Sequence, residues 1–201
     1  MDTFVEWRKV NEHSGQSGAK VIFGKFNGEA GQPDALIARK ALLLFSSMKK
    51  HPAAVLLIRD SDGYRNRQEG QGLKQVREAY PWPFQVVIGV AHPKREAWVL
   101  AGFEPRSRDE SARLQALRER LSTDPILKSH ELDAREHGAK TDIKRALDEL
   151  IQGESDRERQ CLNETALEVL EQRGKSNGLA AYLAEVRQRL VPIFLGRAPE
   201  P

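Results

Sequence analysis

The residues in this sequence best suited to chemistry are two aspartates that follow a short apolar run. Residues 53–58 are all apolar, and Asp60, Asp62 and Gly63 come soon after them. Such a run predicts a parallel strand covered on both faces, and ligands of parallel sheets bind where the strands end. Two carboxylates at that edge can share one divalent cation that orients a phosphate and activates a water. An ordinary Asx turn is the alternative interpretation.

Two glutamates are candidates to join these aspartates. Glu96 opens a helix after a second apolar strand at 84–90, so neighbouring strands would bring it to the same edge of the sheet. It would then be a third carboxylate of an acidic cluster, or it only complements the dipole of its own helix. Glu29 lies in a glycine-containing connection at 28–34, which could hold phosphate or place this carboxylate near the site.

Basic side chains follow the same strands and could track a phosphate backbone, although solvated surface cations are common in any protein. The candidate nucleic-acid contacts are Arg59, Arg65, Lys94 and Arg95. The sequence contains no GxGxxG, GxxxxGK[ST], GxSxG or HExxH motif, which excludes the nucleotide, serine-hydrolase and zinc-protease sites built on them. The single cysteine, Cys161, excludes an internal disulfide and structural zinc.

Strand-like and helix-like segments alternate in the first half of the chain. An extended segment at 20–26, a helix at 33–48, the strand at 53–58, a short helix around 73–80 and the strand at 84–90 give the order β-α-β-α-β. Parallel strands joined by right-handed crossovers form an α/β sheet flanked by helices. The sequence therefore predicts at least three parallel strands.

The second half of the chain has a different pattern. Beyond Gly102 the apolar residues recur at helical spacing with charges between them. We expect an α/β core over residues 1–105 and a helical C-terminal region over residues 106–201 that packs on this core.

Composition predicts a soluble globular protein. Of the 201 residues, 39% are hydrophobic and 30% are charged, which suits a chain with a buried core. The longest apolar run, residues 41–45, is far shorter than the roughly 20 residues of a membrane-spanning helix. The first residues carry no export signal, so we expect a cytoplasmic protein without a membrane partner. The net charge of +3 does not by itself indicate a nucleic-acid partner.

The strand that precedes Asp60 and Asp62, the strand at 86–90 and the helix at 96–100, which reads Glu-Ala-Trp-Val-Leu, together resemble TOPRIM-like proteins. In particular the chain is similar to a bacterial TOPRIM-like family often encoded beside ATPases, over roughly residues 20–105. The resemblance implies Mg²⁺- or Mn²⁺-dependent phosphoryl transfer, usually cleavage of DNA or RNA. It also implies an ATPase partner and the part of a nuclease effector in a bacterial antiviral defence complex.

The same resemblance assigns roles to the acidic residues. Asp60 and Asp62 would hold the metal, and Glu96 would be a further ligand or an orienting acid. TOPRIM domains begin with a strand that ends in a glutamate acting as general acid or base, and no such strand precedes Lys20. Either Glu29 takes that part, or the first strand is missing from this chain, or the protein is inactive.

Two other functions stay open. The chain could be a catalytically inactive TOPRIM-derived interaction module whose helical region binds an ATPase or another copy of the chain. It could also be a haloacid-dehalogenase-like phosphohydrolase, with Asp60 as nucleophile and Asp62 as acid or base. The latter family needs a later strand that ends in further acidic residues, and none is predicted after Gly102.

Overall fold

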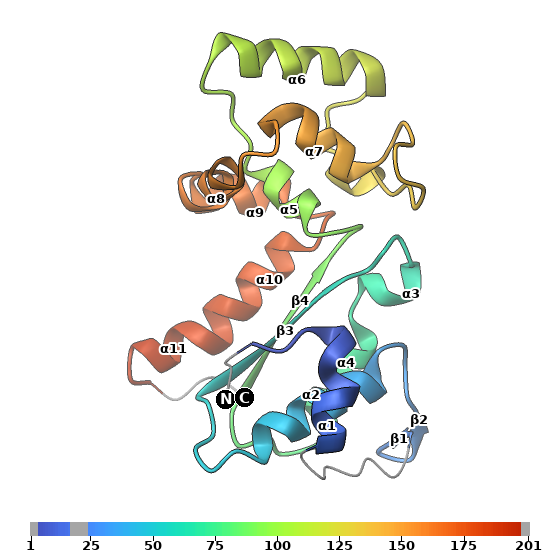
Figure 1. Cartoon of the computed structure of the whole chain (residues 1–201). Helices are drawn as coiled ribbons and strands as arrows, with labels where there is room; N and C mark the ends of the chain where they lie inside the picture. The colour runs from blue at the N-terminus through green and yellow to red at the C-terminus, as the bar shows by residue number, and fades with distance from the viewer. Residues whose placement is uncertain (1–3, 17–23, 198–201) are drawn as a thin grey trace. The chain divides into compact units, whose positions relative to one another are not determined.

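The structure is a computed structural model that describes residues 4–16 and 24–197 (Figure 1). It is a mixed α/β protein in which helices flank a small parallel sheet. The chain divides into two compact units, each described here by itself. The first unit comprises residues 1–57, 69–88 and 185–201, and the second comprises residues 58–68 and 89–184. In the described ranges no helix is long and apolar enough to cross a membrane.

The helices and strands are as follows. The first unit contains η1 (Trp7–Lys9), α1 (Val10–Gln16), β1 (Lys25–Phe26), β2 (Glu29–Ala30), α2 (Ala35–Ser46), α4 (Gln71–Ala79), η3 (Val186–Leu190) and α11 (Val191–Phe194). The second unit contains α3 (Arg65–Gln68), α5 (Glu96–Ala101), α6 (Arg108–Leu121), η2 (Ser129–Glu131), α7 (Ile143–Ile151), α8 (Ser155–Asn163), α9 (Leu167–Arg173) and most of α10 (Leu179–Glu185). The strands β3 (Ala54–Asp60) and β4 (Gln85–Ala91) each run from the first unit into the second.

The pairing of β3 with β4 confirms the two apolar strands predicted from the sequence. The Gln85 amide donates to the Ala53 carbonyl at the start of both strands, at 3.1 Å. The Ser61 amide donates to the Ala91 carbonyl just beyond their ends, at 2.9 Å. Both strands therefore run in the same direction, and their carboxyl ends meet at one edge.

The burial of β3 differs from the prediction. Its residues alternate between buried and exposed positions, and the side chains of Leu56 and Ile58 are 41% and 40% exposed. An alternating pattern is typical of a strand covered on one face only, so the prediction of cover on both faces is wrong for β3. Residues 86–89 in the middle of β4 are all buried, as predicted.

The prediction of a third parallel strand is also wrong for the part of it that the structure describes. Lys25 and Phe26 pair antiparallel with residues 29–30, in a separate two-stranded ribbon. The turn between them is Asn27-Gly28, and both residues have positive φ, 48° and 89°. Two such residues in a two-residue loop form a type I′ turn, which favours a hairpin over a strand that continues into a crossover. Residues 20–23 of the predicted strand lie outside the described residues.

Helix α2 confirms the predicted helix at 33–48 and forms the centre of the first unit. It packs against α1 and α4, and its inward face buries Ala38, Leu42 and Leu44. The first turn of α4 lies so close to the segment before α2 that a Cβ at Gly72 would overlap the carbonyl oxygen of Pro33. Only glycine allows the two backbones to approach in this way.

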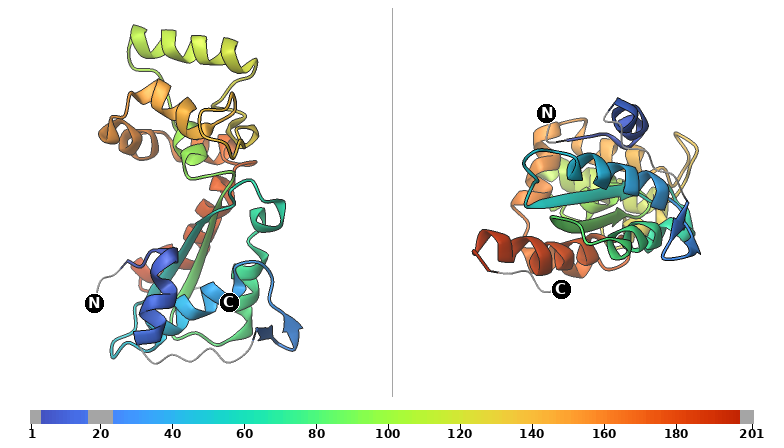
Figure 2. Two further views of the ribbon diagram at one scale, coloured as in Figure 1. Left: turned by 45° about the vertical axis from the view of Figure 1, so that its right-hand side comes forward. Right: turned by 90° about the horizontal axis from the view of Figure 1, so that it is seen from below.

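The second unit contains the predicted helical region. Helix α5 is buried along its whole length after Glu96 and packs against α7 and α8, while α6 lies on α7, as the two orientations in Figure 1 and Figure 2 show. Trp98 of α5 is 5% exposed, which confirms its prediction as a core residue, and its ring stacks on Tyr182 with centroids 5.0 Å apart. The side-chain amide of Asn177 is fully buried and donates to Ala97 and Ser129, so it ties α5 to η2.

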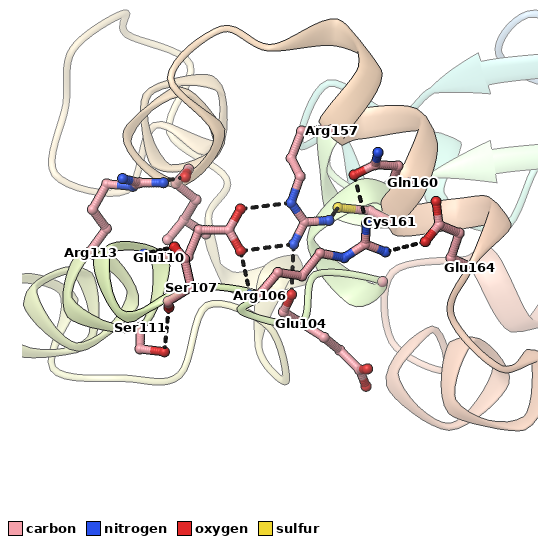
Figure 3. A network of polar contacts seen from close by, with 12 residues as sticks. Glu104, Arg106, Ser107, Glu110, Ser111, Arg113, Arg157, Gln160, Cys161 and Glu164 are labelled. Carbon is pink, nitrogen blue, oxygen red and sulfur yellow. Dashed lines mark hydrogen bonds and ion pairs between the residues drawn. The ribbon is translucent and has the colours of Figure 1, made fainter.

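A buried ion pair links α6 to α8 (Figure 3). Arg157 donates through Nε to one carboxylate oxygen of Glu110 at 2.8 Å and through a terminal nitrogen to the other at 3.1 Å. The guanidinium also lies over the ring of Phe103, 4.9 Å from its centroid. The Glu110 carboxylate accepts a further bond from the Arg106 amide. Both the Arg157 guanidinium and the Glu110 carboxylate are therefore hydrogen-bonded, as buried charged groups must be.

Candidate functional site

The loop between β3 and α3 carries the Asp-Ser-Asp-Gly motif and is fixed to the loop after β4. The Ser61 amide donates to the carbonyl of Ala91, and the Asp62 amide donates to the carbonyl of Pro93, both at 2.9 Å. The backbone turns through the left-handed region at Asp62, with φ 52°, and again at Gly63, with φ 73°. Aspartate and glycine are among the residues that adopt this conformation most readily. The backbone of the turn is therefore by itself a reason for these two residues to stand here.

Ser61, between the two aspartates, points into the protein. It is fully buried and its hydroxyl hydrogen-bonds with the ring of His92, the residue after β4. Burial lowers the pKa of His92, and His130 lowers it further while Asp133 opposes the shift. No motif marks Ser61 or His92 as part of the site, and the signal for Ser61 is the alternation of strand residues, which turns the middle residue of the motif inward.

The pKa of Asp60 is shifted by burial and by the other two acids of the candidate site. Burial raises its pKa, Glu96 and Asp62 raise it further, and the Arg95 amide and Lys144 oppose the shift. The amide nitrogen of Arg95 donates to the Asp60 carboxylate at 2.9 Å, so the turn before α5 holds this side chain in place. The charges of Glu96 and Asp62, both in the second unit, thus act on the Asp60 carboxyl.

The fourth predicted acid lies in the other unit. Glu29 belongs to β2 of the first unit and is exposed. Its hairpin is held by Gln75 of α4, which accepts from the Gln32 amide at 2.8 Å and donates to the Ala30 carbonyl at 3.0 Å. The structure therefore gives Glu29 a hairpin position and not the strand-end position that the other three acids share.

The predicted nucleic-acid contacts all fall near the ends of β3 and β4 in sequence. Arg59 is the half-buried penultimate residue of β3, Arg65 begins α3, and Lys94 is half-buried before α5. Arg95 is exposed, and its guanidinium pairs with Glu158 of α8 at 2.7 Å. The backbone of Arg95 thus positions Asp60, while its side chain already has an anionic partner.

Three basic residues that are not among the predicted nucleic-acid contacts lie around this loop: Arg67, Arg135 and Lys144. The guanidinium of Arg135 lies 4.1 Å from the ring centroid of Tyr64, and that of Arg67 lies 5.1 Å from it. Arg67 also reaches the Asp62 carboxylate at 3.4 Å. Lys144, in the first turn of α7, acts on Asp60. No local signal identifies Arg135 and Lys144, because only the packing of the second unit brings them here.

The acidic residues are of the type that binds a divalent cation, but their side chains are not arranged around a common point. Carboxylate oxygens are the ligands that Mg²⁺ prefers in proteins, and the pKa of Asp60 is raised first by burial and then by the charges of Glu96 and Asp62. Yet in residues 4–16 and 24–197 no group of three or more His, Cys, Asp or Glu side chains is arranged to hold a metal ion. The cluster therefore has the donors of a metal site without a closed coordination shell.

Comparison of the chain with protein-family models, with curated proteins and with solved structures gave no match. The TOPRIM resemblance consequently stays a prediction that the motifs carry. The arrangement of Asp60, Asp62 and Glu96 is the observation from which function is inferred.

Proposed function

We propose that the chain is a Mg²⁺- or Mn²⁺-dependent, nuclease-like phosphoryl-transfer subunit with a TOPRIM-like domain that acts on nucleic acid. One observation carries the proposal: three carboxylates, Asp60, Asp62 and Glu96, interact at the carboxyl ends of two parallel strands. Ligands of parallel sheets bind at this edge, and clustered carboxylates are the usual means of holding Mg²⁺ beside a phosphate.

Each residue of the candidate site has its own role in this proposal. Asp60 and Asp62 would hold the cation, and Glu96 would be a further ligand or an orienting acid. A bound divalent cation lowers the pKa of a water and neutralises the charge of a phosphate. The Arg95 amide holds the Asp60 carboxylate, and the buried Ser61 anchors the loop between the two aspartates. Arg59 and Lys94 would meet the flanking phosphates. Arg65 stays a prediction from the sequence, because its side chain is not among those that the structure describes.

The TOPRIM-like identity also supplies a context for this activity. We infer that the chain works with a partner ATPase, or as several copies of itself, in a bacterial antiviral defence complex. This part of the proposal depends on the motifs alone, and co-purification of the tagged chain with an ATPase tests it.

A second candidate function has two observations in its favour. If the acids never close around a metal, the chain is a TOPRIM-derived interaction module without catalysis. The lack of a closed three-ligand group among the described side chains favours this reading, as does the ion pair between Asp62 and Arg67. Metal binding separates the two candidates.

The experiment is a calorimetric titration of the full chain with Mn²⁺. We expect the wild type to bind and the double variant Asp60→Asn/Asp62→Asn to lose binding, because the amides keep the shape and remove the charge. Asp148→Asn is the matched control, since Asp148 is an exposed carboxylate in the middle of α7. Equal binding by the wild type and the double variant would overturn the proposed site, and absence of binding by both would favour the interaction module.

Activity is then measured on two kinds of substrate. Labelled DNA and RNA, single-stranded and duplex, test for metal-dependent cleavage that the double variant lacks. A small phosphomonoester such as p-nitrophenyl phosphate tests the haloacid-dehalogenase-like alternative. Hydrolysis of the monoester without cleavage of nucleic acid would replace the nuclease proposal with phosphohydrolase activity.

A further inference from the structure

The segment 133–142, which leads into α7, is a loop held tightly by its own hydrogen bonds. Asp133 and Asp142 face each other in an antiparallel bridge, and the Ala134 amide donates to the Thr141 carbonyl. Asp142 is buried, caps α7 through the Lys144 amide at 3.0 Å, and accepts the Gly138 amide at 2.8 Å. A polar loop fixed to this degree presents its exposed side chains with little loss of conformational entropy on binding.

This loop contacts the Asp-Ser-Asp-Gly loop directly. The carbonyl oxygen of Asp133 lies 3.3 Å from the place that a Cβ at Gly63 would take, and Nε of Arg135 lies 3.9 Å from it. The guanidinium of Arg135 lies over Tyr64, the residue after Gly63. Contact with an aromatic ring holds a guanidinium in one orientation and leaves its edge free to donate hydrogen bonds.

Lys144 stands where a cation is disfavoured. It occupies the first turn of α7, and a positive charge at a helix N-terminus opposes the helix dipole. Its neighbour Arg145 is compensated by Glu149 at 2.8 Å. Lys144 is exposed, and among the described residues no carboxylate lies within ion-pairing distance of it. Lys144 therefore forms no ion pair within the described ranges, while its charge reaches Asp60 and lowers the pKa of that carboxyl against the effect of burial. An exposed cation at such a position, beside the acidic residues, is suited to meet an anion that arrives at this edge.

We propose that Arg135 and Lys144 form a phosphate-binding pair that holds a nucleic-acid backbone against the Asp60–Asp62 edge. The inference rests on the proposed function, because it concerns the substrate of the same site. Arg135 provides the planar fork that matches two phosphate oxygens, and Lys144 provides a point charge. Neither group is placed by the described contacts to read a base edge, so recognition through this pair is independent of sequence.

Fluorescence anisotropy of a fluorescein-labelled oligonucleotide, in EDTA and over a series of salt concentrations, tests the pair. The probes are one mixed sequence and its permutation, each as single strand and as duplex, in DNA and RNA. The variants are Arg135→Gln, Lys144→Met and the double variant of the full chain. The matched control is Arg108→Met, an exposed cation that begins α6, a helix that lies on α7 away from the β3–α3 loop.

We expect each single variant to weaken binding about tenfold at low salt and to reduce the slope of log K against log salt by about one. The double variant should reduce that slope by about two, while Arg108→Met stays at the wild-type value. The permuted sequence should bind as tightly as the first. Wild-type affinity and slope in the double variant would overturn the inference, and so would the absence of wild-type binding to every probe.

The Mn²⁺ titration distinguishes this failure from that of the proposed function. If Arg135→Gln/Lys144→Met loses nucleic-acid binding but the wild type binds no metal, the phosphate-binding pair is supported and the nuclease proposal fails. If Mn²⁺ binds through the aspartates while Arg135→Gln/Lys144→Met leaves nucleic-acid binding unchanged, the metal site stands and the pair is wrong. Thermal melting of each variant shows that the chain is folded.

Discussion

The hydroxyl oxygen of Ser61 and Nδ1 of His92 lie 2.7 Å apart, and both side chains are buried. These residues follow the two parallel strands, so the bond joins the strand ends beneath the acidic cluster. The middle residue of the motif thus faces the core, while the aspartates on either side of it are half-buried. The geometry of the candidate site therefore depends on a buried serine.

The first prediction concerns this serine. Ser61→Ala removes a buried hydrogen bond and leaves Nδ1 of His92 without the hydroxyl, which we expect to lower the free energy of unfolding by about 1–3 kcal/mol. Mn²⁺ affinity should fall as well, because the loop between the aspartates loses an anchor. Urea denaturation and calorimetry measure the two effects. Ser111→Ala, at an exposed position of α6, is the control, and equal stability of both variants would contradict the prediction.

The second prediction concerns pH. Hydrogen bonding to Arg157 holds the pKa of Glu110 below its usual range, against the effect of burial. A carboxylate whose pKa is lower in the folded state stabilises the fold above its unfolded value, about 4.3, and this stabilisation is lost as pH falls through the folded value. We therefore expect Glu110→Gln to flatten the acid side of the stability curve.

The same variant should also destabilise the protein at neutral pH. Removal of one partner from a buried ion pair costs about 3 kcal/mol, because the other charge stays buried. Urea denaturation at a series of pH values gives both results. Glu119→Gln, at an exposed position on the same helix, is the control, and an identical pH profile for wild type and Glu110→Gln would refute the assignment.

The third prediction concerns the core of the second unit. Trp98→Ala removes the stack on Tyr182 and the bond from the indole nitrogen to the Asn177 carbonyl, and we expect a loss of about 3–5 kcal/mol. Trp98→Phe keeps an aromatic ring and loses the hydrogen bond, so its loss should be smaller. Thermal melting ranks the variants, and an unchanged melting temperature for Trp98→Ala would mean that this ring is not part of the core.

The fourth prediction compares two glycines in helices of the first unit. Gly72→Ala would place a methyl group on the Pro33 carbonyl, so we expect α4 to be displaced and the protein to be clearly destabilised. Among the described residues no atom lies within 4 Å of the place that a Cβ at Gly15 in α1 would take, and Gly15→Ala should stabilise the helix by up to about 1 kcal/mol. Denaturant titration of both variants tests whether the free energy of unfolding falls for Gly72→Ala and rises for Gly15→Ala.

The sequence was most informative where a pattern reports burial. The apolar runs and the helical spacing predicted α2, β3, β4 and α5, because regular elements bury one face or more and must repeat apolar residues to do so. The same logic placed Asp60, Asp62 and Glu96 at one edge, since carboxyl ends of parallel strands coincide.

The errors have physical causes as well. The strand expected through Phe26 fails at Asn27-Gly28, a two-residue hairpin signal that local reading could have recognised. The exposure of Leu56 and Ile58 on β3 depends on which neighbours cover a strand, and composition does not carry that information. Arg135 and Lys144 reach the site through tertiary packing alone, so no motif could have identified them.

The left-handed backbone at Asp62 decides how a mutational scan of this loop must be interpreted. With φ at 52°, the position suits asparagine nearly as well as aspartate, whereas alanine has to adopt a conformation that it rarely enters. An inactive Asp62→Ala protein would therefore mix a distorted turn with a missing carboxylate. Asparagine removes the charge and leaves the turn unstrained. Glycine also lacks the carboxylate but adopts this φ freely, so the difference between the alanine and glycine variants measures the backbone strain alone.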